Sequence, residues 1–264
     1  MSNWVALVIG NTRWLWSWFQ ERELKYFWHT GHLTHPPHTE RGLHSLWTDQ
    51  LPPQLLSLPV ESIDIWAISV VPGQTQAFTN IQPLARVRWI NCLPLKGVYS
   101  TLGLDRIASL WGAGQHYGWP VLVIDGGTAL TFTGGADATF IGGAIALGVR
   151  AHLAALHHYT AALPQIDIPL DIPSRWANNT PHAIQSGVIH TILATIHQFI
   201  HSWEQHYVKP AILFTGGDGE YLHRLYIQHY QINQNQALTN RTWFDPNLMF
   251  WGISAYRNDD TRRL

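Results

Sequence analysis

The chain has 264 residues, of which 46% are hydrophobic, and its 16 lysines and arginines nearly balance its 17 aspartates and glutamates. This length is sufficient for one large or two modest domains with well-buried cores. The single cysteine, Cys92, cannot form an intrachain disulfide, which excludes a disulfide-stabilised secreted scaffold and favours a reducing cytoplasm. The net charge of -1 provides no broad basic surface, so we expect neither nucleic acid nor an anionic membrane as a partner.

The hydrophobic segments predict no export signal and no membrane span. The N-terminus lacks a basic region followed by a continuous apolar segment and a cleavage site. The uncharged stretch from Ile107 to Ile124 is interrupted by Gln115, His116 and Pro120. We therefore expect a soluble, cytoplasmic protein. Because only 12% of the residues are charged, about half the usual share, much of the surface carries aromatic, amide and imidazole groups, which favours homo-oligomerisation.

Strands and one helix organise the first half. The apolar run from Trp4 to Ile9 stops at Gly10-Asn11-Thr12, and an aromatic run from Trp14 to Phe19 follows, which predicts a hairpin. A further strand is expected from Ile63 to Ser69. Apolar residues at spacings of three and four predict a helix from Ile107 to His116.

The second half begins with the same pattern. The strand-like run from Val121 to Ile124 stops at Asp125-Gly126-Gly127-Thr128, and strand residues resume from Leu130 to Thr133. Thr12 and Thr128, which close the two turns, lie nearly half a chain length apart. A repeat with this period predicts two similar α/β halves, which we place at residues 1–115 and 116–264.

Helices are also expected in the second half. A helix from Val149 to His158 follows the glycine-rich segment Gly142 to Gly148, and a connector rich in proline and aspartate runs from Pro164 to Pro173. The longest helix is predicted to start with Thr180 as its N-cap and Pro181 at its first helical position.

The longest helix should bury one continuous face. Its apolar residues recur at a spacing of about four and are Ile184, Val188, Ile192, Ile196, Ile200 and Trp203. A buried strand from Ala211 to Thr215, closed by the glycine-rich turn Gly216 to Gly219, is expected next. The last helix is predicted from Pro246 to Tyr256, with Asp245 as its cap.

The glycine-rich turns are the first candidates for a ligand site. A strand that ends in such a turn can bring backbone N–H groups and a hydroxyl close to an anion, because glycine has no Cβ to block the approach. Gly10-Asn11-Thr12 alone is more typical of an ordinary hairpin turn than of a phosphate-binding loop. Two such turns at matching positions, with a third at Thr215-Gly216-Gly217, favour a nucleotide-binding cleft between the halves. Neither a Walker loop nor a dinucleotide fingerprint is present.

Two aspartates allow both a structural and a functional interpretation. Asp125 ends a buried strand, where it either forms an Asx turn or binds a cation. Asp105 starts a helix, where it is either an N-cap carboxylate or a base that accepts a hydroxyl proton. In the functional interpretation, the adjacent Arg106 would hold a carboxylate bidentately.

The histidines do not have the spacing of a metal site. Six of them were considered as ligands: His116, His157, His158, His190, His197 and His201. No HExxH motif or paired Cys/His spacing is present, and His197 and His201 are expected on the polar face of the longest helix. We therefore expect surface histidines rather than a zinc site.

The ordered set of motifs resembles that of type III pantothenate kinases. The motifs, which extend over nearly the whole chain, are Gly10-Asn11-Thr12-Arg13, Gly103-Leu104-Asp105-Arg106, Asp125-Gly126-Gly127-Thr128-Ala129, Gly142-Gly143-Ala144-Ile145-Ala146-Leu147-Gly148 and Thr215-Gly216-Gly217-Asp218. Each motif alone is unspecific, but their order and spacing together are specific. The resemblance implies two actin-like, RNase-H-like (ASKHA) α/β halves with ATP in the cleft. It also implies a homodimer in which the partner subunit helps to build the pantothenate site.

The resemblance also assigns roles to individual residues. Asp105 would be the general base for the primary hydroxyl of pantothenate, and Gly103, Leu104 and Arg106 would line the substrate, with Thr180 as a further contact. The nucleotide would be bound by Val8, Ile9, Gly10, Asn11, Thr12, Arg13 and Thr128. Asp125 would bind a monovalent cation, K⁺ or NH₄⁺, and Mg²⁺ would accompany ATP.

Two positions depart from the family pattern. The first turn of the family reads D-x-G-N-T, and here Val8 occupies the aspartate position. A carboxylate that would help to hold Mg²⁺ is therefore missing, which leaves Asp125 and the phosphates to carry the metal. The usual tyrosine and Asn-Pro pair before Gly103 are also missing, and Tyr99 is the candidate replacement for that substrate contact.

The sequence therefore leads to one main hypothesis and two alternatives. The main hypothesis is the ATP-dependent phosphorylation of pantothenate to 4'-phosphopantothenate, the first committed step towards coenzyme A. Because of Val8, the first alternative is a catalytically weakened, nucleotide-binding regulatory protein on the same scaffold. The second alternative, a sugar kinase, is disfavoured because the corresponding motifs are not found.

Overall fold

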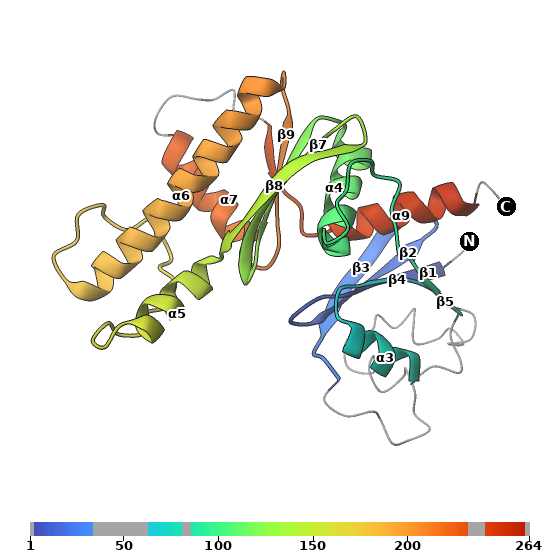
Figure 1. Cartoon of the computed structure of the whole chain (residues 1–264), viewed down its shortest axis with the longest axis horizontal. Helices are drawn as coiled ribbons and strands as arrows, with labels where there is room; N and C mark the ends of the chain where they lie inside the picture. The colour runs from blue at the N-terminus through green and yellow to red at the C-terminus, as the bar shows by residue number, and fades with distance from the viewer. Residues whose placement is uncertain (1–2, 34–62, 81–85, 232–240, 262–264) are drawn as a thin grey trace. The chain divides into compact units, whose positions relative to one another are not determined.

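The computed structural model describes residues 3–33, 63–80, 86–231 and 241–261 (Figure 1). The chain divides into two compact units. Unit 1 comprises Met1–Gly112 and Met249–Leu264, and unit 2 comprises Ala113–Leu248. The sequence placed one division between residues 115 and 116, whereas the contacts divide the chain after Gly112 and assign the C-terminal segment to unit 1.

Unit 1 is built on a five-stranded mixed sheet. Its strands are β1 (Asn3–Ile9), β2 (Trp14–Gln20), β3 (Glu23–Thr30), β4 (Asp64–Ser69) and β5 (Arg86–Trp89), in the order β3-β2-β1-β4-β5. β1 and β2 form the expected antiparallel hairpin, in which Ile9 pairs with Trp14. β4 lies parallel to β1, as a crossover connection requires. A short helix, α3 (Pro72–Asn80), follows β4.

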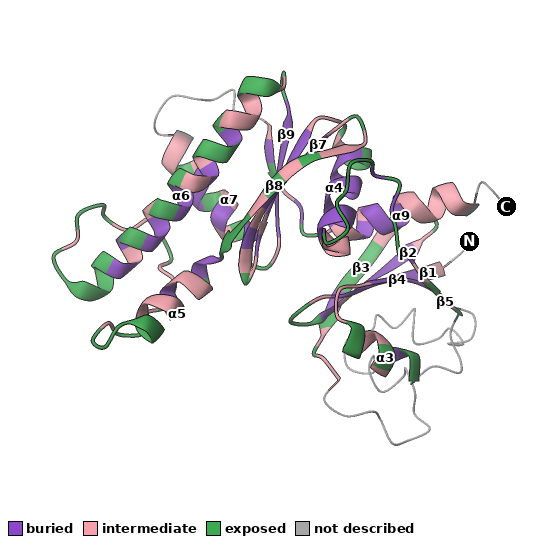
Figure 2. Ribbon diagram, in the orientation of Figure 1, coloured by how far each residue is buried: buried purple, intermediate pink, exposed green. Residues whose placement is uncertain are grey.

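Tryptophan rings fill one face of this sheet. Alternate residues of β1, including Leu7 and Ile9, face a buried cluster that contains Trp14, Trp16 and Phe78. The edge strand β3 is mostly exposed (Figure 2). The Trp14 and Phe78 rings meet edge to face at 5.3 Å, a geometry favoured by aromatic quadrupoles. Some of the indole N–H groups also have partners: Trp16 donates to Thr30 Oγ1 at 3.0 Å. Part of the high tryptophan content is therefore explained by core packing.

Two helices lie largely in the same unit. α4 (Leu104–Tyr117) starts in unit 1, and α9 (Leu248–Thr261) is the last helix of the chain. α9 contacts the sheet through aromatic rings, because Trp251 lies edge to face with Phe19 at 5.9 Å and Tyr256 with Trp66 at 6.2 Å. Helices over a sheet with the order found here are typical of α/β folds.

Unit 2 repeats the sheet of unit 1. Its strands are β6 (Val121–Gly126), β7 (Ala129–Ala136), β8 (Thr139–Leu147), β9 (Ala211–Thr215) and β10 (Thr242–Phe244), in the order β10-β9-β6-β7-β8. The first three strands are antiparallel, and β9 and β10 are parallel to β6 in register, as their counterparts are to β1. The predicted duplication of an α/β half is thus confirmed at the level of strand order and direction.

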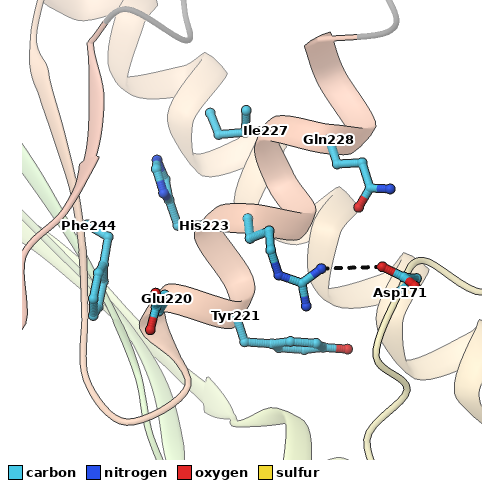
Figure 3. Close-up of a pocket in the computed structure, with 8 residues that line it drawn as sticks. Asp171, Glu220, Tyr221, His223, Ile227, Gln228 and Phe244 are labelled. Carbon is cyan, nitrogen blue, oxygen red and sulfur yellow. Dashed lines mark hydrogen bonds and ion pairs between the residues drawn. The ribbon is translucent and has the colours of Figure 1, made fainter.

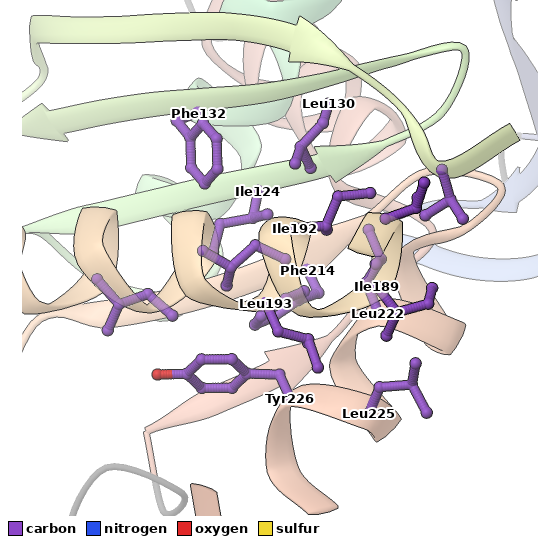
Figure 4. Packing of buried hydrophobic residues seen from close by; sticks show 14 of the residues in the cluster. Ile124, Leu130, Phe132, Ile189, Ile192, Leu193, Phe214, Leu222, Leu225 and Tyr226 are labelled. Atoms are coloured by element: carbon purple, nitrogen blue, oxygen red, sulfur yellow. The ribbon is translucent and has the colours of Figure 1, made fainter. Parts of the chain in front are cut away.

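The core of unit 2 lies between its sheet and two helices. α6 (Thr180–His206) and α7 (Gly219–Gln231) contribute Ile189, Ile192 and Tyr226, which pack with Ile124 and Phe132 of the sheet (Figure 4). α5 (Val149–Tyr159) contacts α6. The predicted apolar face of α6 is confirmed, since five of its six residues are buried and Trp203 packs against the same cluster.

Three predicted helix starts need correction. The N-cap of α6 is Asn179, whose side chain accepts the N–H of His182, so Thr180 is already helical. α9 starts at Leu248 rather than at residue 246 and extends to Thr261, while Asp245 accepts the N–H of Asn247 at 2.7 Å before the helix begins. Asp105 is not an N-cap, because α4 starts at Leu104. Short polar residues do lie near these helix starts, but each helix begins one to three residues away from its predicted start.

No helix in the described part of the chain is both long enough and apolar enough to cross a membrane.

Candidate active site

The first turn of unit 1 is exposed at its tip. Gly10 donates its N–H to Arg13 O at 3.1 Å, which closes the β1–β2 hairpin, and His32 contacts Gly10 O at 2.8 Å. The side chains of Asn11, Thr12 and Arg13 are exposed. The turn therefore presents an amide, a hydroxyl and a guanidinium to solvent, groups that can bind a phosphate.

Val8 and Ile9 lie just before this turn and are fully inside the fold. Val8 is 1% exposed and pairs with Leu15 on one side and with Ile68 on the other. Because strand residues alternate, Val8 and Ile9 point to opposite faces of the sheet. Neither side chain can bind a cation, so any metal near this turn must be held by other groups.

The start of α4 positions Asp105. Gly103 precedes the helix, and its carbonyl accepts the N–H of Ile107 at 3.1 Å. Asp105 Oδ1 accepts the N–H of Arg106 at 2.8 Å, and the other carboxylate oxygen has no hydrogen-bond partner among the described residues. The positive end of the helix dipole favours an ionised carboxylate here. A half-buried carboxylate with one fixed and one available oxygen is suited to accept a proton.

The residues around Asp105 differ in exposure. Arg106 is buried, with 9% of its surface exposed, whereas Leu104 and Gly103 are half-buried. Tyr99 lies in the turn before α4, where its carbonyl accepts the N–H of Leu102 at 3.0 Å, and its side chain is 47% exposed. The sequence-predicted substrate residues 99 and 103–106 thus lie along one short segment.

The second turn, in unit 2, is closely enclosed by backbone. Asp125 pairs with Thr215 across the parallel strands β6 and β9. Its carboxylate lies over Gly216, where a Cβ would collide with it, and Gly216 has a φ of +86° that favours glycine. Asp125 and Thr128 therefore lie in a turn that is packed against the third glycine turn.

The third turn leads directly into α7. Asp218 donates its N–H to Gly126 O at 2.7 Å and accepts the N–H of Leu222 at 2.9 Å, so it is the N-cap residue of this helix. At the other side of the second turn, Gly148 donates its N–H to Thr128 O at 3.0 Å, and a Cβ on Gly148 would collide with Gly127 O. Two helices, α5 and α7, therefore begin beside the second turn, where helix N-termini favour anions.

Thr180 is placed apart from these turns by its contacts. It is exposed at the first residue of α6, and no hydrogen bond among the described residues links its side chain to the second turn.

A family model described as type III pantothenate kinase matches residues 4–202. Curated relatives named type III pantothenate kinase include that of Nostoc sp., which is 36% identical over 96% of this chain and 94% of its own length. The relative from Synechococcus sp. strain JA-3-3Ab is 37% identical over 96% of this chain and 92% of its own. That of Gloeobacter violaceus is 35% identical over 95% of this chain and 96% of its own.

The chain belongs to the type III pantothenate kinase family. The resemblance drawn from the ordered motifs is thereby confirmed. Membership of a kinase family implies a phosphotransferase that uses ATP together with a divalent metal ion.

Solved structures agree with the fold of this family member. A Campylobacter jejuni protein assigned to the Baf family of transcriptional activators has a TM-score of 0.61 at 20% identity, covering 98% of this chain and 99% of its own. A Sinorhizobium meliloti protein assigned as a 2-dehydro-3-deoxygalactonokinase has a TM-score of 0.59 at 14% identity, covering 97% and 96%. MreB5 of Spiroplasma citri bound to ADP has a TM-score of 0.51 at 10% identity, covering 100% and 98%. At these identities the likeness concerns the fold alone, and it confirms two actin-like α/β halves.

The donor groups of this type III pantothenate kinase fit a metal carried by phosphates. Among the residues that the structure describes, no group of three or more histidine, cysteine, aspartate or glutamate side chains could hold a metal. Asp125 is the carboxylate of the second turn, and position 8 in unit 1 is apolar. Mg²⁺ in kinases is usually bound through one or two carboxylates, water and substrate phosphates, so a single carboxylate is compatible with it.

The histidines are only partly at the surface. His116, His157, His158 and His201 are exposed, as expected. His190 and His197 are half-buried, because His190 contacts Pro173 O at 3.0 Å and His197 stacks on Tyr230 at 4.1 Å. The predicted surface position was therefore wrong for His190 and His197. The polar residues of α6 suggested that this side of the helix faces water, but α7 covers it.

A pocket of about 870 Å³ opens on α7, and none of the sequence-predicted site residues lines it (Figure 3). Arg224 pairs with Asp171 at 3.4 Å and lies over the Tyr221 ring at 5.6 Å. Burial raises the pKa of Tyr221 to about 12, with smaller contributions from Arg224, which lowers it, and from Asp218 and Asp171, which raise it. The side chains that could bind a ligand here are charged and aromatic.

Two charged residues of the glycine-turn region, Asp218 and Arg150, are assigned no role by the sequence patterns, although Asp218 belongs to the motif Thr215-Gly216-Gly217-Asp218. A signal for Arg150 was available, because a basic residue in the first turn of a helix opposes the usual charge preference.

Proposed function

We propose that this protein transfers the γ-phosphoryl group of ATP to the primary hydroxyl of pantothenate, yielding 4'-phosphopantothenate and ADP. Family membership supports the reaction class. The observation that carries the proposal is the Asp105 carboxylate at the start of α4, with one oxygen held by the N–H of Arg106 and the other without a partner among the described residues.

Asp105 is the general base of the proposed reaction. It accepts the hydroxyl proton of pantothenate as the hydroxyl oxygen forms its bond to the γ-phosphorus and the bond to the ADP oxygen breaks. Arg106 contributes a fixed positive charge that suits the pantothenate carboxylate. Tyr99, Gly103 and Leu104 line the same substrate.

We assign the nucleotide contacts to the glycine turns, each described within its own unit. In unit 1, Gly10 to Arg13 offer exposed polar groups, while Val8 and Ile9 support the turn from within the sheet. In unit 2, Thr128 lies at the turn that is bordered by the N-termini of α5 and α7. Backbone N–H groups of this kind are suited to phosphate oxygens.

Asp125 is the cation residue of the proposed site. It binds a monovalent cation, K⁺ or NH₄⁺, and it is also the carboxylate available to Mg²⁺ bound to the phosphates. When bound, the divalent ion neutralises charge that builds up on the phosphoryl group during transfer.

We further propose a cytoplasmic homodimer with Thr180 as a pantothenate contact. The apolar side chains Ile141, Ile145 and Leu147 along the edge strand β8 are about half exposed or more, which supports burial against a second subunit. The free thiol of the exposed Cys92 is compatible with a reducing compartment. The molar mass in solution tests the dimer.

The test of the reaction is a coupled assay of ADP release with ATP, Mg²⁺ and pantothenate, with and without K⁺. Asp105→Asn keeps an acceptor for the N–H of Arg106 but removes the base, so turnover should fall on the order of 100- to 10,000-fold. The matched control is Asp137→Asn, an exposed aspartate in the β7–β8 turn, which should retain turnover.

The alternatives predict different results in the same assay. ATP binding without pantothenate-dependent ADP release would contradict the proposal and favour the nucleotide-binding regulatory protein. ADP release that depends on a sugar instead of pantothenate would favour the sugar kinase. Full turnover in Asp105→Asn would remove the proposed base.

A further inference from the structure

The glycine-turn region of unit 2 contains a positively charged side chain to which the proposed function assigns no role. Arg150, in the first turn of α5, donates its Nε–H to Asp218 Oδ1 at 3.2 Å. The Arg150 side chain is 74% exposed, whereas that of Asp218 is 10% exposed. The guanidinium is thus anchored through one nitrogen, and its two terminal amino groups have no partner among the described residues.

Arg150 links the second and third turns. Two residues before it, Gly148 donates its N–H to Thr128 O in the second turn. Its own side chain reaches Asp218, the N-cap residue of α7 in the third turn. The guanidinium is therefore held beside the backbone groups that the proposed function assigns to phosphate binding.

The position of this arginine is unfavourable for α5 by itself. The helix has no acidic residue in its first turn, and its N-cap Gly148 makes no side-chain hydrogen bond. A positive charge near a helix N-terminus opposes the helix dipole. The Asp218 carboxylate offsets this effect, and a bound anion would offset it further.

We propose that Arg150 binds the phosphate chain of the nucleoside triphosphate through its terminal amino groups, with Asp218 as the residue that positions it. This inference rests on the proposed function, because it takes the glycine turns as the phosphate site. The planar guanidinium can hold a carboxylate through Nε and present the rest of its fork to phosphate oxygens. An ammonium group at this position would have to serve both partners from one point.

The test compares Arg150→Gln and Arg150→Lys with the unmodified protein. The matched control is Lys209→Gln, which removes one exposed positive charge at the opposite, N-terminal end of β9. The affinity for Mg²⁺–ATP is measured by calorimetry at constant ionic strength, and the KM values for ATP and pantothenate by the coupled assay. Melting temperatures report whether each variant is folded.

Loss of a charge-assisted phosphate contact should weaken ATP binding on the order of 10- to 100-fold in Arg150→Gln. The KM for pantothenate should remain within about twofold of its original value, because the contact involves the nucleotide alone. Arg150→Lys should recover only part of the ATP affinity, and Asp218→Asn, which removes the positioning charge, should weaken ATP binding less than Arg150→Gln. A purely structural ion pair would change the melting temperature but not the ATP affinity.

Unchanged ATP affinity in folded Arg150→Gln, or a loss equal to that of Lys209→Gln, overturns the inference. Full recovery by lysine overturns the proposed bidentate contact. If the unmodified protein releases no ADP with pantothenate, the proposed function fails, but calorimetry still decides the role of Arg150 through its effect on ATP binding.

Discussion

The two halves share one sheet design but differ at the turn after the first strand. Ile9 pairs with Ser69 at the end of β1, and Asp125 pairs with Thr215 at the corresponding place on β6. The hydroxyl residue is kept on β4 and β9, whereas its partner is an apolar side chain on β1 and a carboxylate on β6. The shared strand order preserves the scaffold, and the charged chemistry is distributed unevenly over it.

The turns also differ in how firmly they are held. The first turn is closed by one hairpin hydrogen bond and by His32 at Gly10 O. The second is enclosed by Gly148, Gly216 and Asp218, each in contact with its backbone or its aspartate. A turn held by several backbone contacts needs less reorganisation to bind an anion. We infer that unit 2 supplies the preorganised part of the nucleotide site.

The largest effect is expected when a carboxylate is placed just before the first turn, by the substitution Val8→Asp. This variant tests whether the difference in charge between the two turns matters. Val8 is almost fully buried, so Val8→Asp should lower the free energy of unfolding by about 3 kcal/mol or more in the absence of ligand. If a phosphate-borne Mg²⁺ approaches this turn, Mg²⁺–ATP should raise the melting temperature of the variant more than that of the unmodified protein. Turnover should rise in parallel. Melting curves with and without Mg²⁺–ATP give the comparison.

Val8→Asn is the control for this substitution. It has the same shape without the charge, so it should lose stability but gain no additional protection from Mg²⁺. Equal responses of Asp and Asn to Mg²⁺–ATP would show that the first turn does not contribute to a metal site.

Replacing one glycine by alanine in each unit should destabilise the enclosed turn region of unit 2 more than the first turn of unit 1. Gly216→Ala forces a residue with a Cβ to a φ of +86° and into the Asp125 carboxylate, so the free energy of unfolding should fall by about 1–3 kcal/mol or more. In Gly10→Ala the nearest atom, Arg13 O, is 3.3 Å from the new Cβ, and the cost should stay below about 1 kcal/mol. Denaturant unfolding measures both values.

If Gly216→Ala and Gly10→Ala lost similar amounts of unfolding free energy, the turns of the two units would not differ in how closely they are enclosed. Gly148→Ala provides a second measurement for unit 2, because its Cβ would collide with Gly127 O. It should resemble Gly216→Ala in stability and in weakened ATP binding.

Features that depend on a local residue pattern could be predicted from the sequence. Contacts between segments that are far apart in the chain could not. The hairpin from Trp4 to Phe19 and the face of α6 follow from alternation and from a spacing of four, so both were predictable. The contact of Arg150 with Asp218 spans 68 positions, and no local pattern announces it. The burial of His197 depends on α7 packing beside it, which its polar neighbours in the sequence concealed.

The motifs of the candidate site could be recognised for a related reason. The motifs that contain Asp105, Asp125 and Thr128 could be recognised because turns fix residue type at short spacing. The cap positions were less predictable, since Asn179 and Thr180 are both good capping residues and tertiary packing selects between them. The order of the motifs was therefore sufficient to suggest the family. The contacts between the second and third glycine turns are seen only in the structure.

The smallest expected effect concerns the histidines between α6 and α7, a feature of unit 2. Burial lowers the pKa of His229, with smaller contributions from His190, Arg175 and His197, and burial followed by His201 lowers that of His197. A pKa that is lower in the folded state means that the unfolded chain binds protons more readily. The stability from these groups is therefore complete above their ordinary pKa of about 6.5 and is lost as the pH falls through and below it.

His229→Gln should consequently flatten the dependence of the melting temperature on pH between about 7.5 and 5.5. Both groups are partly exposed, so solvent screening limits the change to on the order of 2 °C. His158→Gln, an exposed residue of α5, should leave the pH dependence as it is in the unmodified protein. An equal slope for His229→Gln and the unmodified protein would show that the α6–α7 contact does not respond to protonation, and the difference between the two halves would then be confined to their glycine turns.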